Sequence, residues 1–165
     1  GDYDGGTPWH PTQTSGSTAS YLRDFKAKQI LETTPKDKDG QWADRKAIYA
    51  RESVKLADYP DEVPVKLQAH RIGALSIASA PCEIFVEIGL ELKKTTPFTR
   101  HFTISLANGY NGYLPTAEHH ALGGYETWRA RSSYLEAPAA DKITAKLKEM
   151  LGALRSGDLA SLRGM

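Results

Sequence analysis

The clearest periodic pattern of the chain lies near its C-terminal end, over residues 139–154. Apolar residues recur there at spacings of three and four, which places them on one face of a helix. Pro138 precedes the segment and Gly157 follows it, and these residue types are favoured at the start and just past the end of a helix. The sequence therefore predicts a helix here. Its apolar face consists of Ile143, Leu147, Met150, Leu151 and Leu154.

Two further helices are predicted within the first sixty residues. Residues 18–31 fit helical spacing loosely, and residues 42–57 repeat alanine and valine at intervals of three and four. The polar segment PKDKDGQ, from Pro35, separates them. Residues 1–17 are rich in Gly, Thr, Ser and Pro, so we expect them to be irregular.

Alternation of apolar and polar positions predicts strands in the middle of the chain. Residues 65–69 alternate in this way, and we expect a second strand over 72–78, with a tight turn between the two at 71–73. Residues 102–106 are predicted to form another short strand. Residues 83–94 fit a strand and a helical stripe equally well, so both remain open. Because helices and strands alternate, we predict an α/β fold, with a mixed sheet flanked by helices.

Length and composition limit the possible classes of protein. The chain has 165 residues, 40% of them hydrophobic and 25% charged, with a formal net charge of +1. These values are ordinary for a globular domain, and the interleaved charges give no sign of a nucleic-acid surface. No apolar run approaches a membrane span, and the single Cys82 excludes an internal disulfide framework or a multi-cysteine metal site.

The domain boundaries follow from these patterns. We expect a single α/β domain over residues 18–157 and a short tail over residues 158–165. The chain does not begin with Met, and we expect it to be a fragment of a larger α/β catalytic domain.

The segment NGYNGYLPT at 108–116 repeats Asn-Gly-Tyr twice. Asn and Gly both tolerate a positive φ, so the segment is typical of a loop. The tyrosines of such a loop either cover the edge of the core or point into a ligand site that the glycines allow the backbone to approach. The pattern alone leaves both interpretations open for Tyr110 and Tyr113.

Other polar residues have similarly divided interpretations. Glu83, in the segment PCEIF, is either a first-turn residue favoured by a helix dipole or a functional residue at a strand end. His119 and His120 are adjacent, and neighbouring helical residues point about 100° apart, so a surface pair is favoured over a shared metal. We interpret His70 and His101 as structural histidines, and we interpret Cys82 as a small buried hydrophobe.

Taken together, these segments resemble the C-terminal part of the catalytic domain of neutral, non-lysosomal ceramidases. The similar segments are PCEIF at 81–85, NGYNGY at 108–113, the turn LPT with Glu118, and GYE at 124–126. The resemblance covers about residues 65–155.

The resemblance implies a zinc-dependent amidohydrolase that cleaves an N-acyl amide bond of a lipid through a metal-activated water. It implies Glu83 as the carboxylate ligand of the zinc and Tyr113 as the phenolate ligand. Tyr125 would hydrogen-bond the scissile amide. Asn108 and Tyr110 are weaker candidates for substrate binding, and Tyr110 is also expected to pack.

The two metal-binding histidines of that family lie upstream of the matching region. The resemblance therefore implies that this chain works together with an upstream portion of the same protein. We expect the fragment alone to bind no zinc and to be inactive, since zinc sites require three or four protein ligands. Periplasmic or secreted localisation is favoured for this family.

Two other hypotheses remain. The chain is either a non-catalytic binding or assembly module that keeps the fold, or an unrelated α/β domain in which the tyrosines are structural. The enzyme hypothesis predicts that Glu83, Tyr113 and Tyr125 converge at one surface, whereas the unrelated domain predicts that they point apart.

Overall fold

The structure is a computed structural model that describes residues 17–158, with side chains described from residue 25 onward. The chain divides into two compact units, which are described separately. Among the described residues, the first unit contains residues 17–62 together with Trp128–Tyr134. The second contains Val63–Thr127 together with residues 135–158. The expected single domain over 18–157 stays a prediction. The segment 1–17, which we expected to be irregular, and the expected tail 158–165 lie outside the described residues, apart from residues 17 and 158.

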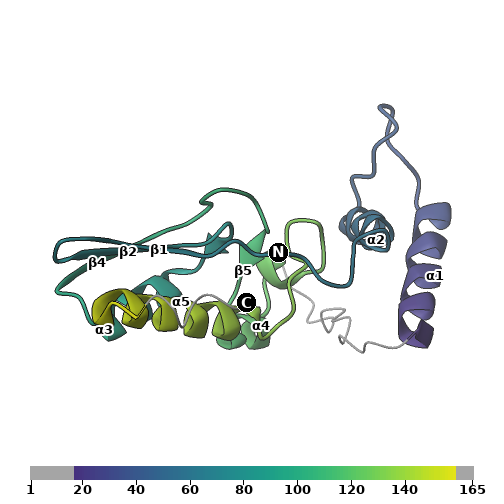
Figure 1. Ribbon diagram of the computed structural model, residues 1–165. Coiled ribbons are helices and arrows are strands. Elements are labelled where there is room, and N and C mark those ends of the chain that lie inside the picture. The colour runs from purple at the N-terminus through teal and green to yellow at the C-terminus, as the bar shows by residue number, and fades with distance from the viewer. Residues whose placement is uncertain (1–16, 159–165) are drawn as a thin grey trace. The chain divides into compact units, whose positions relative to one another are not determined.

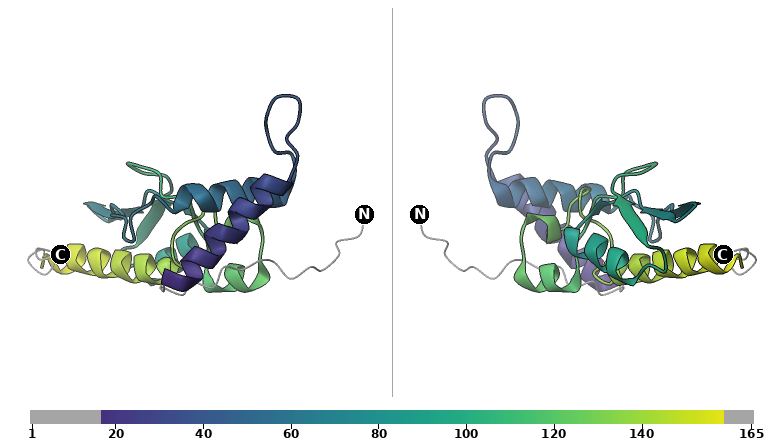
Figure 2. Two further views of the ribbon diagram at one scale, coloured as in Figure 1. Left: turned by 90° about the vertical axis from the view of Figure 1, so that its right-hand side faces the viewer. Right: turned by 90° about the vertical axis from the view of Figure 1, so that its left-hand side faces the viewer.

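The first unit is built on two helices, α1 (Ser17–Thr33) and α2 (Arg45–Leu56), which pack against each other (Figures 1 and 2). Both correspond to predicted helices. Helix α2 begins later than predicted because Asp44 is its N-cap, and the Asp44 side chain accepts a hydrogen bond from the amide of Ala47 at 3.0 Å. Buried alanines in both helices permit their close approach.

The second unit contains a three-stranded mixed sheet with the order β1 (Gln68–Ile72), β2 (Leu75–Ser79) and β4 (Arg100–Ile104). Strands β1 and β2 form an antiparallel hairpin, whereas β2 and β4 are parallel. The connection between the parallel strands contains helix α3 (Val86–Thr95). The predicted α/β fold with a mixed sheet is confirmed.

The remaining elements of the second unit are short, apart from one helix. A two-stranded parallel sheet joins β3 (Glu83–Ile84) to β5 (Tyr113–Leu114). Helix α4 (Ala117–Leu122) and a 3₁₀ turn (Tyr125–Thr127) follow, and α5 (Ala139–Ser156) is the long C-terminal helix.

One face of the three-stranded sheet is covered by α3 and α5 (Figure 1). The predicted apolar face of α5 points into this core, where Leu147 and Leu151 are fully buried and Ile143 is nearly so. Gly157 ends α5 in the left-handed region at φ 80°, as the sequence predicts. The core also contains Ala78, Ile88, Leu92 and Leu114.

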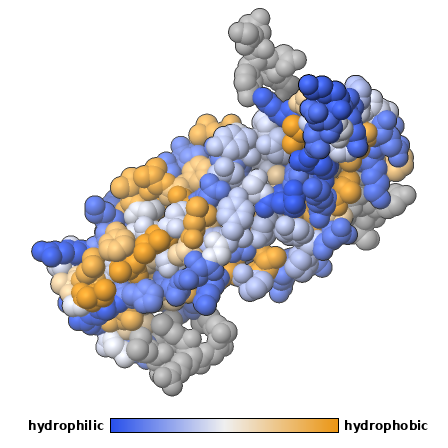
Figure 3. Space-filling view, turned by 90° about the horizontal axis from the view of Figure 1, so that it is seen from above, coloured by the Kyte–Doolittle hydropathy of each residue, from blue (hydrophilic) through white to orange (hydrophobic). Residues whose placement is uncertain are grey.

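The opposite face of the sheet carries large apolar side chains that are exposed. Strand register places Ile72, Phe102 and Ile104 on this face together with the half-buried Ile77, and the exposed Leu106 follows β4. Figure 3 looks from above onto this side of the second unit, where apolar residues gather. None of the described helices is both long enough and apolar enough to cross a membrane.

The strand boundaries differ from the sequence predictions. The predicted strands 65–69, 72–78 and 102–106 correspond to β1, β2 and β4, which lie at Gln68–Ile72, Leu75–Ser79 and Arg100–Ile104. The turn expected at 71–73 lies one residue later, because Ile72 pairs with Leu75 and Gly73 adopts the positive φ that a tight hairpin turn requires. Residues 83–94, which fitted both a strand and a helix, are divided between the two. Glu83 lies in strand β3, and the helix begins only at Val86, so Glu83 is not a first-turn residue.

Candidate functional site

The segment that contains Glu83 continues from the C-terminal end of β2 and is held by the loop that follows β4. The amide of Glu83 donates to the carbonyl of Gly112 at 2.9 Å, and the amide of Ile84 donates to the Ser105 hydroxyl, also at 2.9 Å. Further bonds run from the amides of Leu106, Ala107 and Asn111 to the carbonyls of Cys82, Ala80 and Pro81, at N···O distances of 2.9, 3.1 and 2.6 Å. The backbone of Glu83 is therefore fixed at the C-terminal edge of the parallel strands, where α/β proteins place their ligand sites.

The repeated Asn-Gly pair allows the loop to fold back against this segment. Asn108, Gly109 and Gly112 all have positive φ, at 60°, 153° and 75°. A Cβ atom added to Gly109 would lie 3.3 Å from the Cβ of Pro81, so a larger residue would crowd this close approach. The side-chain amide of Asn108 donates to the side-chain carbonyl of Gln68. The role of Asn108 in substrate binding stays a prediction.

The β3–β5 pairing brings Glu83 and Tyr113 together. They are directly paired residues of parallel strands, so their side chains leave the small sheet on the same face. The hydroxyl of Tyr110 donates to Oε1 of Glu83 at 3.1 Å. The ring of Tyr125 packs edge-on against the ring of Tyr113, with 5.6 Å between the ring centroids. The residues that the sequence singled out therefore converge on one place.

The electrostatic environment keeps the phenol of Tyr113 protonated. Its hydrogen bond with Tyr125, followed by burial and by the negative charge of Glu83, raises the pKa of Tyr113 to about 12. A cation beside the phenol would act in the opposite direction and favour the phenolate.

The expectation that Tyr110 packs against the core is wrong. Its side chain is 54% exposed, and its hydroxyl is directed to the carboxylate of Glu83. The loop backbone, bonded to residues 80–83, carries the ring outward.

His119 has structural contacts within the second unit. Its ring lies edge-on to Phe85 with 4.4 Å between the ring centroids, and its Nδ1 lies 2.7 Å from the hydroxyl of Thr116, the N-cap of α4. Its Nε2 lies 3.9 Å from Oε1 of Glu87 on α3. These contacts join α4 to α3. A capping threonine three residues before His119 is a signal that the sequence contained.

Two further histidines and the cysteine were interpreted as structural residues. His101 is buried, and its ring nitrogens lie 2.8 Å from the hydroxyl of Ser76 and 3.2 Å from that of Thr103. Its interpretation as a structural histidine agrees with these contacts. Cys82 is fully buried, and burial raises the pKa of its thiol to about 11, as expected of an unreactive core cysteine. His70 is exposed in β1.

The donor atoms at this site fit part of a zinc shell. Within residues 17–158, no group of three or more His, Cys, Asp and Glu side chains is placed to hold a metal ion. The carboxylate of Glu83 and the phenol of Tyr113 supply oxygen donors for two positions, whereas zinc sites use three or four protein ligands.

The fold and this cluster define an α/β protein with a carboxylate and several phenols at the C-terminal edge of parallel strands. No protein-family model matches the sequence, and no curated protein matches it. A solved structure described as "Ceramidase complexed with C2" is similar to this chain, with 24% sequence identity and a TM-score of 0.48. The match covers 55% of this chain and 15% of that protein.

Proposed function

We propose that this chain provides Glu83 and Tyr113 as ligands to the zinc of an amidohydrolase that resembles neutral ceramidases. An upstream portion of the same protein would provide the remaining ligands. The substrate would be an N-acyl amide of a lipid. The observation that supports this proposal is the direct pairing of Glu83 and Tyr113, which projects both donors from one face of the small sheet.

Each residue of the cluster has a distinct part in this proposal. Bound zinc would supply an activated water and polarise the amide carbonyl. Glu83 contributes negative charge, and Tyr113 contributes a phenolate after it releases its proton. Tyr125, in ring contact with Tyr113, places a hydroxyl where it can donate to the scissile amide and stabilise the developing oxyanion.

The raised pKa of Tyr113 has a consequence for metal binding. Because the phenol must lose its proton to become a ligand, metal binding competes with protonation and strengthens as pH rises. Replacement of Tyr113 by Phe would remove this component of the pH dependence as well as the ligand.

The test uses the full-length protein. Its zinc content is measured, together with the release of fatty acid from an N-acyl sphingosine. We expect stoichiometric zinc and measurable hydrolysis, and we expect Glu83→Gln and Tyr113→Phe to lose most of both. Glu149→Gln is the matched control, because Glu149 is exposed and pairs with Lys146 on the surface of α5.

The alternatives give different results in the same experiment. A zinc-free and inactive full-length protein would rule out the amidohydrolase and favour a binding or assembly module. The 165-residue chain alone should bind zinc weakly and show no hydrolysis, because it offers only part of the coordination shell.

A further inference from the structure

Glu83 is held both at its backbone and at its carboxylate. Its backbone amide donates to the carbonyl of Gly112, and its Oε1 accepts a hydrogen bond from the hydroxyl of Tyr110 at 3.1 Å. No ion pair joins Glu83 to a Lys, Arg or His of residues 17–158. A neutral hydroxyl therefore orients this carboxylate and leaves its charge uncompensated.

The position of Tyr110 is set by the backbone of its loop. The preceding residues Asn108 and Gly109 both have positive φ, and the amide of Asn111 donates to the carbonyl of Pro81 at 2.6 Å. The ring itself is more than half exposed. The contact between Tyr110 and Glu83 thus joins a loop and a strand whose backbones are hydrogen-bonded to each other.

We propose that Tyr110 is a positioning residue that orients Glu83 for metal binding. This inference rests on the proposed function. With Oε1 accepting the Tyr110 hydroxyl, the carboxylate plane is oriented, and Oε2 is the oxygen that this bond leaves to a cation. Hydrogen-bond partners of this kind fix the orientation of a ligand, and their loss typically weakens metal affinity by about 10- to 100-fold.

The experiment measures zinc affinity of the full-length protein by competition with a chelator. Tyr110→Phe removes the hydroxyl and keeps the ring, and we expect its zinc dissociation constant to rise by about 10- to 100-fold. Tyr59→Phe is the matched control, because Tyr59 is also exposed and its ring contact with Tyr134 needs no hydroxyl. Its affinity should equal that of the unmodified protein.

A double-mutant cycle separates orientation of Glu83 from a general effect on the loop. If Tyr110 acts through Glu83, then Tyr110→Phe should cause no further loss of zinc affinity in a Glu83→Ala background. The same fold-loss in both backgrounds would overturn the proposal. Unchanged affinity in the single Tyr110→Phe variant would overturn it as well, and a raised KM with unchanged zinc affinity would reassign Tyr110 to substrate binding.

Failure of this inference is distinguishable from failure of the proposed function. If Glu83→Ala weakens zinc binding and Tyr110→Phe does not, only the role of Tyr110 is wrong. If the unmodified full-length protein binds no zinc, both are wrong. Urea unfolding of the 165-residue chain should give the same midpoint with and without Tyr110→Phe, which excludes loss of folding as the cause.

Discussion

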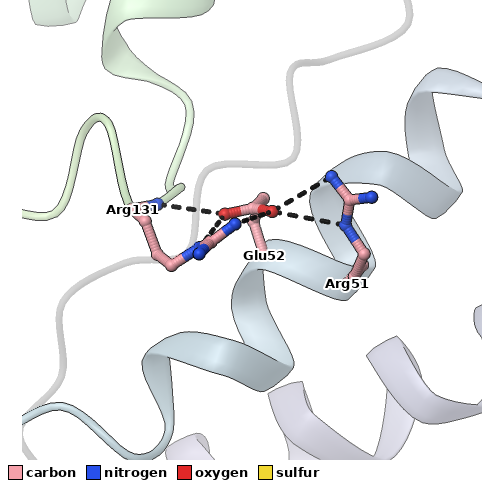
Figure 4. Close-up of polar contacts among 3 residues, drawn as sticks. All are labelled: Arg51, Glu52 and Arg131. Atoms are coloured by element: carbon pink, nitrogen blue, oxygen red, sulfur yellow. Dashed lines mark hydrogen bonds and ion pairs between the residues drawn. The ribbon is translucent and has the colours of Figure 1, made fainter.

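The buried carboxylate of Glu52 provides a sharp test of how the first unit is held together. Glu52 lies on α2 and is 6% exposed. It accepts hydrogen bonds from Nε and Nη2 of Arg131 at 2.7 and 3.1 Å, and from Nε of Arg51 at 3.3 Å (Figure 4). This arrangement fastens the segment Trp128–Tyr134 to α2.

Replacement of Glu52 by Gln keeps the size of the side chain and removes its charge. Hydrogen bonds to a charged group contribute about 1.5–3 kcal/mol, against about 0.5–1.5 kcal/mol for neutral ones. Gln also offers one acceptor oxygen instead of two, while the 45% exposure of the Arg131 side chain lets water replace part of the loss. We therefore expect Glu52→Gln to lower the free energy of unfolding by about 2 kcal/mol at neutral pH, or roughly 30-fold in the equilibrium constant.

The pH dependence follows from the hydrogen bond with Arg131. That bond, chiefly, holds the pKa of the Glu52 carboxyl below its ordinary value of 4.5, although burial opposes the shift. A lowered carboxyl pKa adds stability above the unfolded value, and this stability is lost as pH falls through the folded pKa. The difference in free energy of unfolding between the unmodified chain and Glu52→Gln should therefore reach its full size at neutral pH and shrink in acid.

The assay is urea unfolding followed by tryptophan fluorescence. Among the described residues, the tryptophans are Trp42 and Trp128, and both belong to the first unit. The emission of these two side chains therefore reports on the first unit. Equal urea midpoints at neutral pH would refute the reasoning, and so would a difference that persists unchanged at about pH 3.

Three further predictions concern the second unit. Burial, assisted by the charge of Lys93, holds the pKa of His101 below 6.5, so stability should fall as pH drops below that value, and His101→Gln should flatten this dependence in thermal unfolding. An equal slope of stability against pH in the unmodified chain and in His101→Gln would contradict this prediction. Leu147→Ala should cost about 2–5 kcal/mol because it leaves a cavity, whereas Phe102→Ser on the exposed sheet face should cost about 1 kcal/mol or less in urea unfolding. Cys82 should resist thiol reagents at mild pH until urea is added, and rapid labelling of the native protein would show that the thiol is accessible.

The helices could be predicted from the sequence because their determinants are local. The apolar face of α5 recurs within one or two turns, and Pro138 and Gly157 mark its ends. Helix α2 was predicted with less accurate ends, since its N-cap at Asp44 lies inside the predicted range. Capping and periodicity both involve residues four positions apart or fewer, so they can be recognised directly in the sequence.

The division of residues 83–94 depended on tertiary structure. Their pattern fitted two periods, and the choice was made by the bond between Glu83 and Gly112 and by the pairing of β3 with β5. These partners are some thirty residues apart, so no local pattern contains them. The register of β1 against β2, in contrast, is set locally by the hairpin turn at Gly73.

The candidate site shows the same division. The sequence, through its resemblance to ceramidases, selected Glu83, Tyr113 and Tyr125, and it provided the glycines that let their loop turn. Only the folded chain brought these residues together and directed Tyr110 to Glu83. The Glu52–Arg131 contact, between residues 79 positions apart, had no signal in the sequence at all. Local hydrogen bonds and side-chain spacing are determined by neighbouring residues. Contacts between distant segments form only when packing of the core brings the two segments together and offsets the entropy cost of closing the chain between them.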